Sequence, residues 1–303
     1  NVLTLKQILA TKLQEHNNAM LYDQFRDKIG EIVIGEVHHI RKQHAILLDD
    51  DDNEFILPKE NQIPSDFFKK GESIRAIVDS VDFKGAKPQI IVSRTSPRFL
   101  EKLLELEIPE IQDGTIMLKK VVRIPGEKAK IAVDAYDDRI DPVGACVGVK
   151  GSRIHGVVRE LRNENIDVIQ WSKNPEILVK RALGNVTINK IDLNTEQQYA
   201  MVYTPVEEIS KVIGKQGQNI KLASWLTGLE IDVYRETSED DDVELNEFKD
   251  EIEEWVIEEF KKVGLNTARS VLDKDTEALL NLVDLEEEQI DEVKQILKEE
   301  LES

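Results

Sequence analysis

The stretch VGVKGSRI, residues 147–154, places two glycines three positions apart around a valine and a lysine. A short apolar segment ends just before it, and Ile154, Val157, Val158 and Leu161 then recur at the spacing of one helix face. The two glycines are therefore predicted to lie in a loop between two helices. By itself, this loop is either an ordinary tight turn or a cradle for a phosphate group.

The sequence VIGKQGQNI, residues 212–220, repeats the pattern, and its second glycine follows that of the first copy by 66 residues (217 against 151). Each copy leads through a helical pattern to the tripeptide Ile-Asp-Val, at 166–168 and at 231–233. Each copy is also preceded by a predicted helix, two strands and a second helix. An internal repeat of this kind indicates one supersecondary unit that is present twice.

Both loops combine features that favour phosphate binding. Glycine has no Cβ, so the backbone can approach a ligand closely, and the next helix presents free amide groups and its positive dipole end. A lysine lies inside each loop, Lys150 in the first and Lys215 in the second, which two plain turns would not require. Neither loop has the spacing of a mononucleotide P-loop or of a dinucleotide-binding turn. The pattern G-x-x-G between two helices is typical of the KH domain, which clamps about four nucleotides of a single strand.

The sequence therefore predicts two tandem KH domains that bind single-stranded RNA through these loops. The predicted RNA contacts are Gly148, Val149, Lys150, Gly151, Ser152 and Arg153 in the first copy, and Gly214, Lys215, Gln216, Gly217, Gln218, Asn219 and Lys221 in the second.

Residues 29–96 follow a strand-like period instead. Five short runs rich in isoleucine and valine are separated by turn residues, and five strands in a segment of this size indicate a small closed barrel such as an OB-fold. OB-folds bind nucleic acid through aromatic and cationic side chains. The acidic run at 49–54 lacks the glycine and final glutamate of an EF-hand loop, so we expect a solvated hairpin tip. The candidate RNA contacts of the barrel are His38, His39, Arg41, Lys42, Phe55 and Arg75.

The acidic residues are distributed unevenly. The net charge is −20, but residues 1–96 carry 13 Lys and Arg against 15 Asp and Glu, and residues 97–236 carry 20 against 21. Residues 237–303 carry 7 against 24, a net charge of −17. The first 236 residues are thus close to neutral and can present a basic face, whereas the acidic segment disfavours phosphate binding.

Together these patterns predict a multidomain α+β protein. A linker helix at 1–28 precedes an all-β OB-fold barrel at 29–96, and two KH domains of type II follow at 97–172 and 173–236. The segment 237–303 is predicted to be an acidic, all-α domain, because its apolar residues recur at helical spacing between brief turns.

The composition excludes several classes of protein. No apolar run reaches the roughly 18 residues of a membrane span, and the first residues lack the basic and apolar blocks of a signal peptide. The single cysteine, Cys146, cannot form an internal disulfide, which fits a reducing cytoplasm. The five histidines do not cluster with carboxylates at ligand spacing, and no catalytic triad is recognisable. We therefore expect a cytoplasmic protein with no enzyme activity, metal, cofactor or membrane contact.

With the order OB-fold, KH, KH in place, the sequence resembles the NusA family of bacterial transcription factors. The resemblance lies in VVRIPGEKAKIAV, DPVGACVGVKGSRIHGVVREL, IDVIQW and VIGKQGQNIKLASWLTGLEIDV for the KH region, and in GEIVIGEV and IIVSR for the barrel. It covers about residues 1–236. The tail from 244 onward looks like the acidic helix-hairpin-helix-like repeat at the C-terminus of some members.

The resemblance implies a factor that contacts nascent RNA and RNA polymerase and modulates pausing, intrinsic termination and antitermination. It implies other Nus-type factors as partners, and polymerase docking mainly through an N-terminal domain that would precede the helix at 1–28. The sequence has no initiator methionine and is expected to be part of a longer chain. The acidic tail reads LVDL at 282–285, where a DNA-binding hairpin uses glycines. Its expected target is a protein partner or the KH face of the same chain.

Two other classes of function stay open on the residues alone. Phosphorolytic ribonucleases also carry KH and OB modules, although with one of each, in the opposite order and on a large catalytic core. An RNA-binding subunit of an RNA-degradation complex is therefore the alternative. A protein scaffold whose KH units no longer bind RNA is the third possibility, against which the loop lysines argue.

Overall fold

The computed structural model describes residues 2–137, 139–195, 197–235, 244–249, 251–272, 274–280, 282–283 and 285–301. The chain forms two compact units, Asn1–Tyr234 and Arg235–Ser303, which are described separately. In the described part of the chain, no helix is both long enough and apolar enough to cross a membrane.

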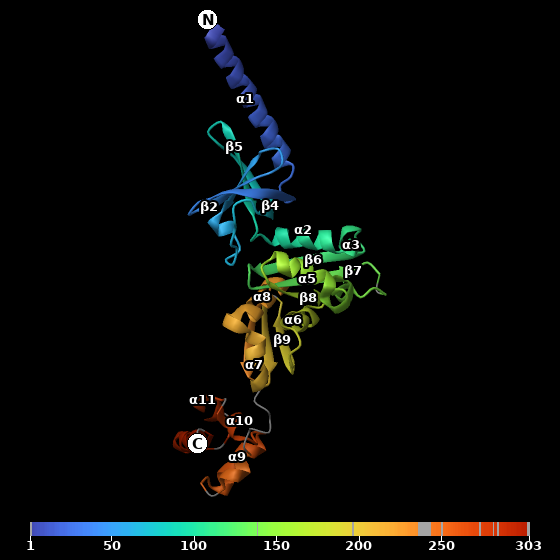
Figure 1. Cartoon of the computed structure of the whole chain (residues 1–303). Coiled ribbons are helices and arrows are strands. Elements are labelled where there is room, and N and C mark those ends of the chain that lie inside the picture. Colours follow the sequence, from blue (N-terminus) through green and yellow to red (C-terminus); the bar gives the residue numbers. More distant parts are fainter. Residues whose placement is uncertain are drawn as a thin grey trace. The chain divides into compact units, whose positions relative to one another are not determined.

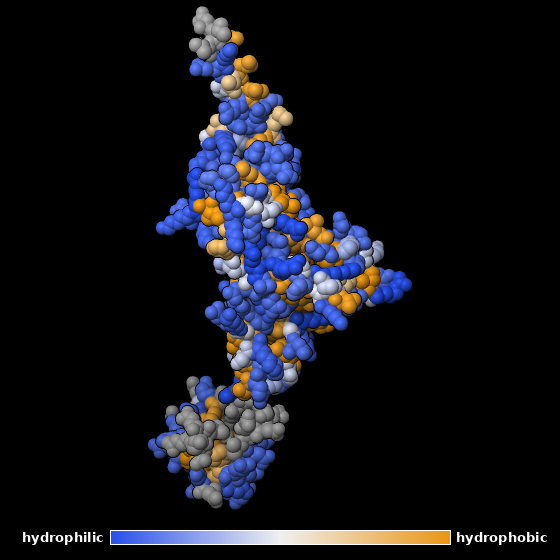
Figure 2. Space-filling model, viewed as in Figure 1, coloured by the Kyte–Doolittle hydropathy of each residue, from blue (hydrophilic) through white to orange (hydrophobic). Residues whose placement is uncertain are grey.

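The first unit begins with the long helix α1 (Val2–Arg26), close to the predicted bounds. Its C-terminal half packs on the barrel: Phe25 is buried in the barrel core, and the ring of Tyr22 stacks on Phe83 with centroids 4.7 Å apart. The N-terminal half extends beyond the barrel, and hydrophobic side chains are exposed along it (Figures 1 and 2). These exposed side chains are Leu5, Ile8, Leu9 and Leu13.

The five predicted strands form a closed barrel in the order β1-β2-β3-β5-β4. Only the β3–β5 pair is parallel among the strand pairs described for this barrel. Apolar residues alternate along each strand, and the inward set closes the core. The acidic run lies at the tip of the β2–β3 hairpin, as predicted. The strands are β1 (Ile32–Ile40), β2 (His44–Leu48), β3 (Glu54–Pro58), β4 (Ser73–Lys84) and β5 (Lys87–Ser93).

The first repeat forms a three-stranded sheet in the order β6-β7-β8, with helices on one face. The β6–β7 hairpin turns at Pro125-Gly126, and β8 runs parallel to β7 at the sheet edge. The order of elements agrees with the prediction, apart from the extra short helix α3. The elements are α2 (Pro97–Glu107), α3 (Pro109–Gln112), β6 (Ile116–Ile124), β7 (Lys128–Ala135), α4 (Pro142–Val147), α5 (Ser152–Glu160) and β8 (Asn165–Gln170).

The second repeat has the same order of elements and a sheet in the order β11-β10-β9. Its first strand begins at Lys190. Helix α8 of this repeat packs on β6 and β7, where Ala132, fully buried, leaves room for it (Figure 1). The elements are α6 (Pro175–Leu183), β9 (Lys190–Asn194), β10 (Tyr199–Thr204), α7 (Val206–Ile213), α8 (Gln218–Thr227) and β11 (Glu230–Arg235).

A buried ionic network joins the barrel to the first repeat. The guanidinium of Arg94 donates to Asp66 of the barrel (Nε–Oδ2 2.9 Å) and to Glu160 of α5 (Nη1–Oε1 2.9 Å). Arg123 and Glu164, both fully buried, form a second ion pair at 2.6 Å, and Arg123 Nη1 also donates to the backbone carbonyl of Arg94. If the barrel and the first repeat separated, each buried charge would lose its partner, which is strongly unfavourable. This network therefore holds the barrel against the first repeat.

The described part of the second unit is helical around one apolar core. Its first part contains a short 3-10 helix and then α9, and the chain turns after α9 at Gly264, which has a left-handed φ of 84°. Trp255 of α9 is exposed. Most of the acidic run at 238–244 lies outside the described residues. The helices are η5 (Leu245–Phe248), α9 (Glu254–Lys262), α10 (Ala268–Leu272), α11 (Thr276–Leu280) and α12 (Glu287–Leu301).

Candidate nucleic-acid interface

The first loop, Gly148–Gly151, lies between α4 and α5, as the sequence predicts. The side chain of Asp141 accepts from the backbone amide of Val143 and starts α4, which ends when Gly148 adopts φ 73° and ψ 173°. This backbone conformation is essentially restricted to glycine. Gly151 then takes the left-handed conformation, and α5 begins without a side-chain cap. The first of its amide groups, that of Ser152, donates to the carbonyl oxygen of Val149, and no side chain caps the amide groups that follow it.

The second loop, Gly214–Gly217, has the same backbone path. Gly214 has φ 74° and ψ 174°, and Gly217 is left-handed before the uncapped start of α8. The third loop position is left-handed in both copies although neither residue is glycine: φ is 54° at Lys150 and 52° at Gln216. The two loop lysines are thus at different positions, because Lys215 occupies the second position, where the first loop has Val149.

Two residues that were predicted to contact RNA instead hold the loops in shape. Arg153 Nη1 donates to the carbonyl oxygen of Ala145 at 2.8 Å and to both carboxylate oxygens of Glu110. In the second loop, Asn219 is at the position that corresponds to Arg153, five residues after the first glycine. Its side-chain amide donates to the carbonyl oxygens of Leu183 (2.9 Å) and Val212 (3.0 Å). Asn219 is buried, so its prediction as an RNA contact is wrong, and the Arg153 guanidinium is already engaged.

The remaining polar loop side chains are exposed or half-buried. Among the described residues, no carboxylate forms an ion pair with Lys150 or Lys215, so both ammonium groups are available to phosphate. Lys221 lies over the ring of Trp225, 4.9 Å from its centroid. The outer loop residues are exposed, and Val149 reaches 82%. Ser152 and Gln216 are exposed, and Gln218 is half-buried.

The barrel candidates do not form one site. His38, Arg41, Lys42 and Arg75 are exposed, but His38 lines a hollow with Glu36 and Asp49, whereas Arg75 lines another with Arg159 and Glu160. His39 stacks on His38 with ring centroids 4.5 Å apart. Because His38 and Arg75 line different hollows, the predicted barrel residues do not form one continuous cationic surface.

The prediction of Phe55 as an RNA contact is wrong. Its side chain is 1% exposed and packs edge-on against Phe25 inside the barrel, so it cannot stack on a base. The alternation of Phe55 with the equally buried Leu57 was the signal for this inward orientation. Phe67, which is not among the predicted contacts, is 75% exposed and close in sequence to Lys69 and Lys70.

Cys146 is fully buried beside the first loop, as expected for a small apolar side chain. Burial raises the pKa of its thiol to about 11, so the nucleophilic thiolate is scarce at neutral pH. In the ranges that the structure describes, no group of three His, Cys, Asp or Glu side chains is arranged to hold a metal ion.

Two family descriptions match the two repeats. The NusA-like first KH domain matches residues 94–171, and the NusA-like second KH domain matches residues 175–241. The two repeats are thus tandem KH domains, as the sequence predicts.

Three curated relatives carry the name "Transcription termination/antitermination protein NusA". The chain is 39% identical to that of Halalkalibacterium halodurans over 234 residues, which are 77% of this chain and 61% of the relative. It is 36% identical to that of Thermus thermophilus over 227 residues (75% and 59%). It is 38% identical to that of Bacillus subtilis over 251 residues (83% and 67%).

The chain therefore spans about three fifths of the length of the first two relatives and two thirds of the third. The matched regions include most of this chain, and the two KH domains lie in the order that the family descriptions give. On these grounds the chain belongs to the NusA family.

Proposed function

We propose that the chain is a non-catalytic transcription factor that binds nascent, single-stranded RNA. The observation that carries the proposal is the pair of G-x-x-G loops, each with an exposed lysine that no described carboxylate neutralises and each followed by an uncapped helix start. Phosphate oxygens would accept from the free amide groups and pair with the lysines. The proposed contacts are the loop backbone and the side chains of Lys150, Ser152, Lys215, Gln216, Gln218 and Lys221.

The closed barrel supports a second contact. We infer that it is an OB-fold, bounded at about 29–96, and that exposed Phe67 stacks on a base beside Lys69 and Lys70. His38, Arg41, Lys42 and Arg75 are exposed and belong to the same proposal.

The wider role follows the relatives' names. We propose that the protein modulates pausing, termination and antitermination in the cytoplasm, together with RNA polymerase and other Nus-type factors. Polymerase contact would belong mainly to the N-terminal domain of the family. The acidic C-terminal domain, helix-hairpin-helix-like in its short helices, would bind a protein partner or the chain's own KH face. The relatives' names do not favour the alternative of an RNA-degradation complex.

The test removes both loop cations and keeps the backbone. Lys150→Asn retains a residue that tolerates left-handed φ, and Lys215→Gln retains the length of a polar side chain. In a fluorescence anisotropy titration with a 12-nucleotide RNA, we expect this double variant to bind at least tenfold more weakly. The slope of log K against log salt should shrink by about 1.4, since each lost phosphate contact removes about 0.7.

The matched control removes two exposed lysines remote from the loops in the fold, Lys12→Gln on α1 and Lys190→Gln on β9. It should leave the affinity within twofold and the salt slope unchanged. The proposed function is wrong if the wild-type chain does not bind RNA. The assignment of the loops is wrong if the control loses as much affinity as the loop variant.

A further inference from the structure

The second KH sheet has one face packed on its helices and one face that carries tyrosine rings. Side chains alternate along β9, β10 and β11, and the inward set belongs to the core with α6, α7 and α8. We call the outward surface the tyrosine face. It comprises Lys190 and Asp192 of β9, Tyr199 and Tyr203 of β10, and Asp232 and Tyr234 of β11.

The rings of the tyrosine face hold one another in place. Tyr203 and Tyr234 stack with centroids 5.6 Å apart, and the hydroxyl oxygens of Tyr199 and Tyr234 are 3.2 Å apart. The Tyr199 hydroxyl donates to Oδ2 of Asp232 at 2.5 Å, and this hydrogen bond raises the pKa of Tyr199. Tyr234 is nevertheless 42% exposed. The surface is thus ordered before a partner arrives, which lowers the entropy cost of binding.

One tyrosine of this face already holds a cation. Nζ of Lys190 lies over the ring of Tyr203, 5.4 Å from its centroid, and pairs with Asp192 at 2.9 Å. A ring and a carboxylate therefore hold one ammonium group together. Tyr234 and Asp232 offer the same combination on β11. Among the described residues, however, no cation lies over Tyr234 or pairs with Asp232.

The charge of this surface selects the kind of partner. Glu230 lies two residues before Asp232 on β11, so it faces the same side, and no described cation pairs with it. Because Lys190 is the only cation of the tyrosine face, the face has a net charge of −2 when Glu230 is included. This charge repels RNA phosphates. It also repels the acidic segment 237–303 of the same chain.

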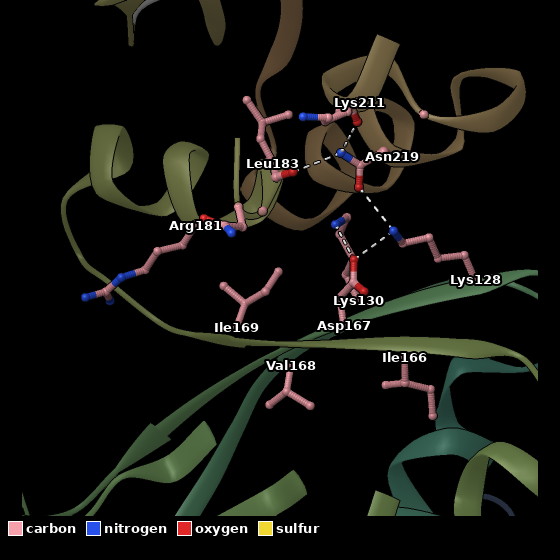
Figure 3. Close-up of a pocket in the computed structure, with 13 residues that line it drawn as sticks. Lys128, Lys130, Ile166, Asp167, Val168, Ile169, Arg181, Leu183, Lys211 and Asn219 are labelled. Atoms are coloured by element: carbon pink, nitrogen blue, oxygen red, sulfur yellow. Dashed lines mark hydrogen bonds and ion pairs between the residues drawn. The ribbon is translucent and has the colours of Figure 1, made fainter. Parts of the chain in front are cut away.

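The first KH domain shows that this side of the sheet can receive a protein element. On the first sheet, the face opposite its own helices is covered by α8, and Lys128 of β7 donates to Asn219 of that helix (Figure 3). On the second sheet, Tyr234 and the side chain of Lys190 are exposed on this side. Tyrosine is also enriched in interfaces between proteins. A protein is therefore the favoured partner.

We propose that the tyrosine face binds arginine side chains of a basic protein segment. One guanidinium stacks on Tyr234 and pairs with Asp232, as the ammonium group of Lys190 does with Tyr203 and Asp192. Arginine suits this place better than lysine, because its planar guanidinium stacks on a ring and pairs with a carboxylate at the same time. The tyrosine face contains no residue of either G-x-x-G loop, so this proposal goes beyond the proposed function and does not depend on it.

The test uses the full chain and a helical, alanine-based peptide of about 16 residues with arginines four positions apart. Because such a peptide also binds the acidic segment, its binding is followed at the tyrosine face itself, through the amide NMR shifts of 190–194 and 199–203. We expect these shifts to saturate as the peptide is added. The same peptide with lysines should bind about threefold more weakly, and with glutamates it should leave the amides unshifted.

The variants separate the ring and the carboxylate from the general charge of the chain. Asp232→Asn, Tyr234→Ala should weaken binding of the arginine peptide at these amides about tenfold, because both groups that hold the guanidinium are lost. Tyr234→Phe keeps the ring and should stay within twofold. The matched control, Asp134→Asn, Tyr136→Ala, removes the same residue types at the same spacing in the first KH domain, where Lys119 pairs with Asp134. It should also stay within twofold.

Four results would overturn the proposal. The arginine peptide leaves these amides unshifted, or the control variant loses as much affinity as Asp232→Asn, Tyr234→Ala. Single-stranded RNA shifts them more than the peptide does, which would make the face a platform for bases. They shift with protein concentration alone, which would make a second copy of the chain the occupant. The RNA affinity of the loop variants decides the proposed function separately. Amide spectra that match the wild type away from the substitutions assure that the variants are folded.

Discussion

Replacing Gly214 with alanine should damage the second KH domain far more than replacing Gly217, although both glycines have positive φ. At Gly214, φ 74° with ψ 174° is a conformation that costs other residues up to about 3 kcal/mol. A Cβ there would lie 2.6 Å from Cβ of Asn219 and 3.1 Å from its backbone nitrogen. Asn219 cannot move away, because its amide group is held by carbonyl oxygens, so overpacking adds about 1–3 kcal/mol.

At Gly217 the physical situation is milder. Its φ of 72° and ψ of 10° are left-handed helical, which other residues adopt at about 1–2 kcal/mol. A Cβ at this position would meet no described heavy atom within 4 Å. Alanine also lowers the conformational entropy of the unfolded chain, which raises the free energy of unfolding by about 0.4–1 kcal/mol. We therefore expect Gly214→Ala to cost about 4 kcal/mol and Gly217→Ala about 1 kcal/mol.

Hydrogen exchange followed by mass spectrometry measures this difference locally, because the three tryptophans in different domains would mix the signals of a global unfolding experiment. A gap of about 3 kcal/mol corresponds to about a hundredfold greater opening of the peptides that cover 206–227. Peptides from the barrel serve as the internal control and should not change. If the two variants agree within 0.5 kcal/mol, the argument from the Asn219 contact is wrong.

Two further predictions concern the first loop. Lys150→Gly relieves the left-handed strain of a lysine but adds the flexibility of glycine, so hydrogen exchange of the peptides that cover 142–161 should show a gain of about 0.5 kcal/mol. The same change should lower the salt slope of RNA binding by about 0.7, and a loss of stability would contradict the strain argument. For the pH dependence, the hydrogen bond from Arg153 lowers the pKa of Glu110, so this stabilisation is present above the ordinary glutamate pKa and lost as the pH falls through the lowered value. Below about pH 4 the exchange protection of 142–155 should therefore fall more than that of 206–221, where uncharged Asn219 has the corresponding role. Equal losses in the two segments would exclude this role of Glu110.

The sequence predicts the order of the elements well, because strand and helix periods differ and the repeat shows each KH unit twice. It also predicts both loops, since glycine spacing and the following helix are local features. The roles of Arg153 and Asn219 were not predictable in this way. Both were chosen for their proximity to the loop, whereas their partners are carbonyl groups of the preceding helices and, for Arg153, Glu110 of α3.

The contacts between domains could not be predicted from the sequence pattern either. Nothing in the local pattern of Lys128 or Arg181 distinguishes them from the solvated lysines and arginines elsewhere in the chain. Both line a cavity of about 540 Å³ between the two KH domains, which forms because α8 packs on the first sheet. This packing joins residues about 90 positions apart, as in the bond from Lys128 to Asn219. A period of two or 3.6 residues carries no information at that separation.

The sheets of the two KH domains can be aligned by a hydrogen bond that they share. The amide of Asn165 donates to the carbonyl of Glu127 in the first sheet, and the amide of Glu230 donates to the carbonyl of Gln198 in the second. In the first sheet, the small Ala132 admits α8 of the next domain. The same alignment puts Tyr203 at this position in the second sheet, where its ring stacks on Tyr234 with centroids 5.6 Å apart. The surface that receives a helix on the first sheet is thus occupied by a pair of aromatic rings on the second. The two KH domains are therefore alike in the order of their elements but differ in the face that each sheet offers to a neighbour.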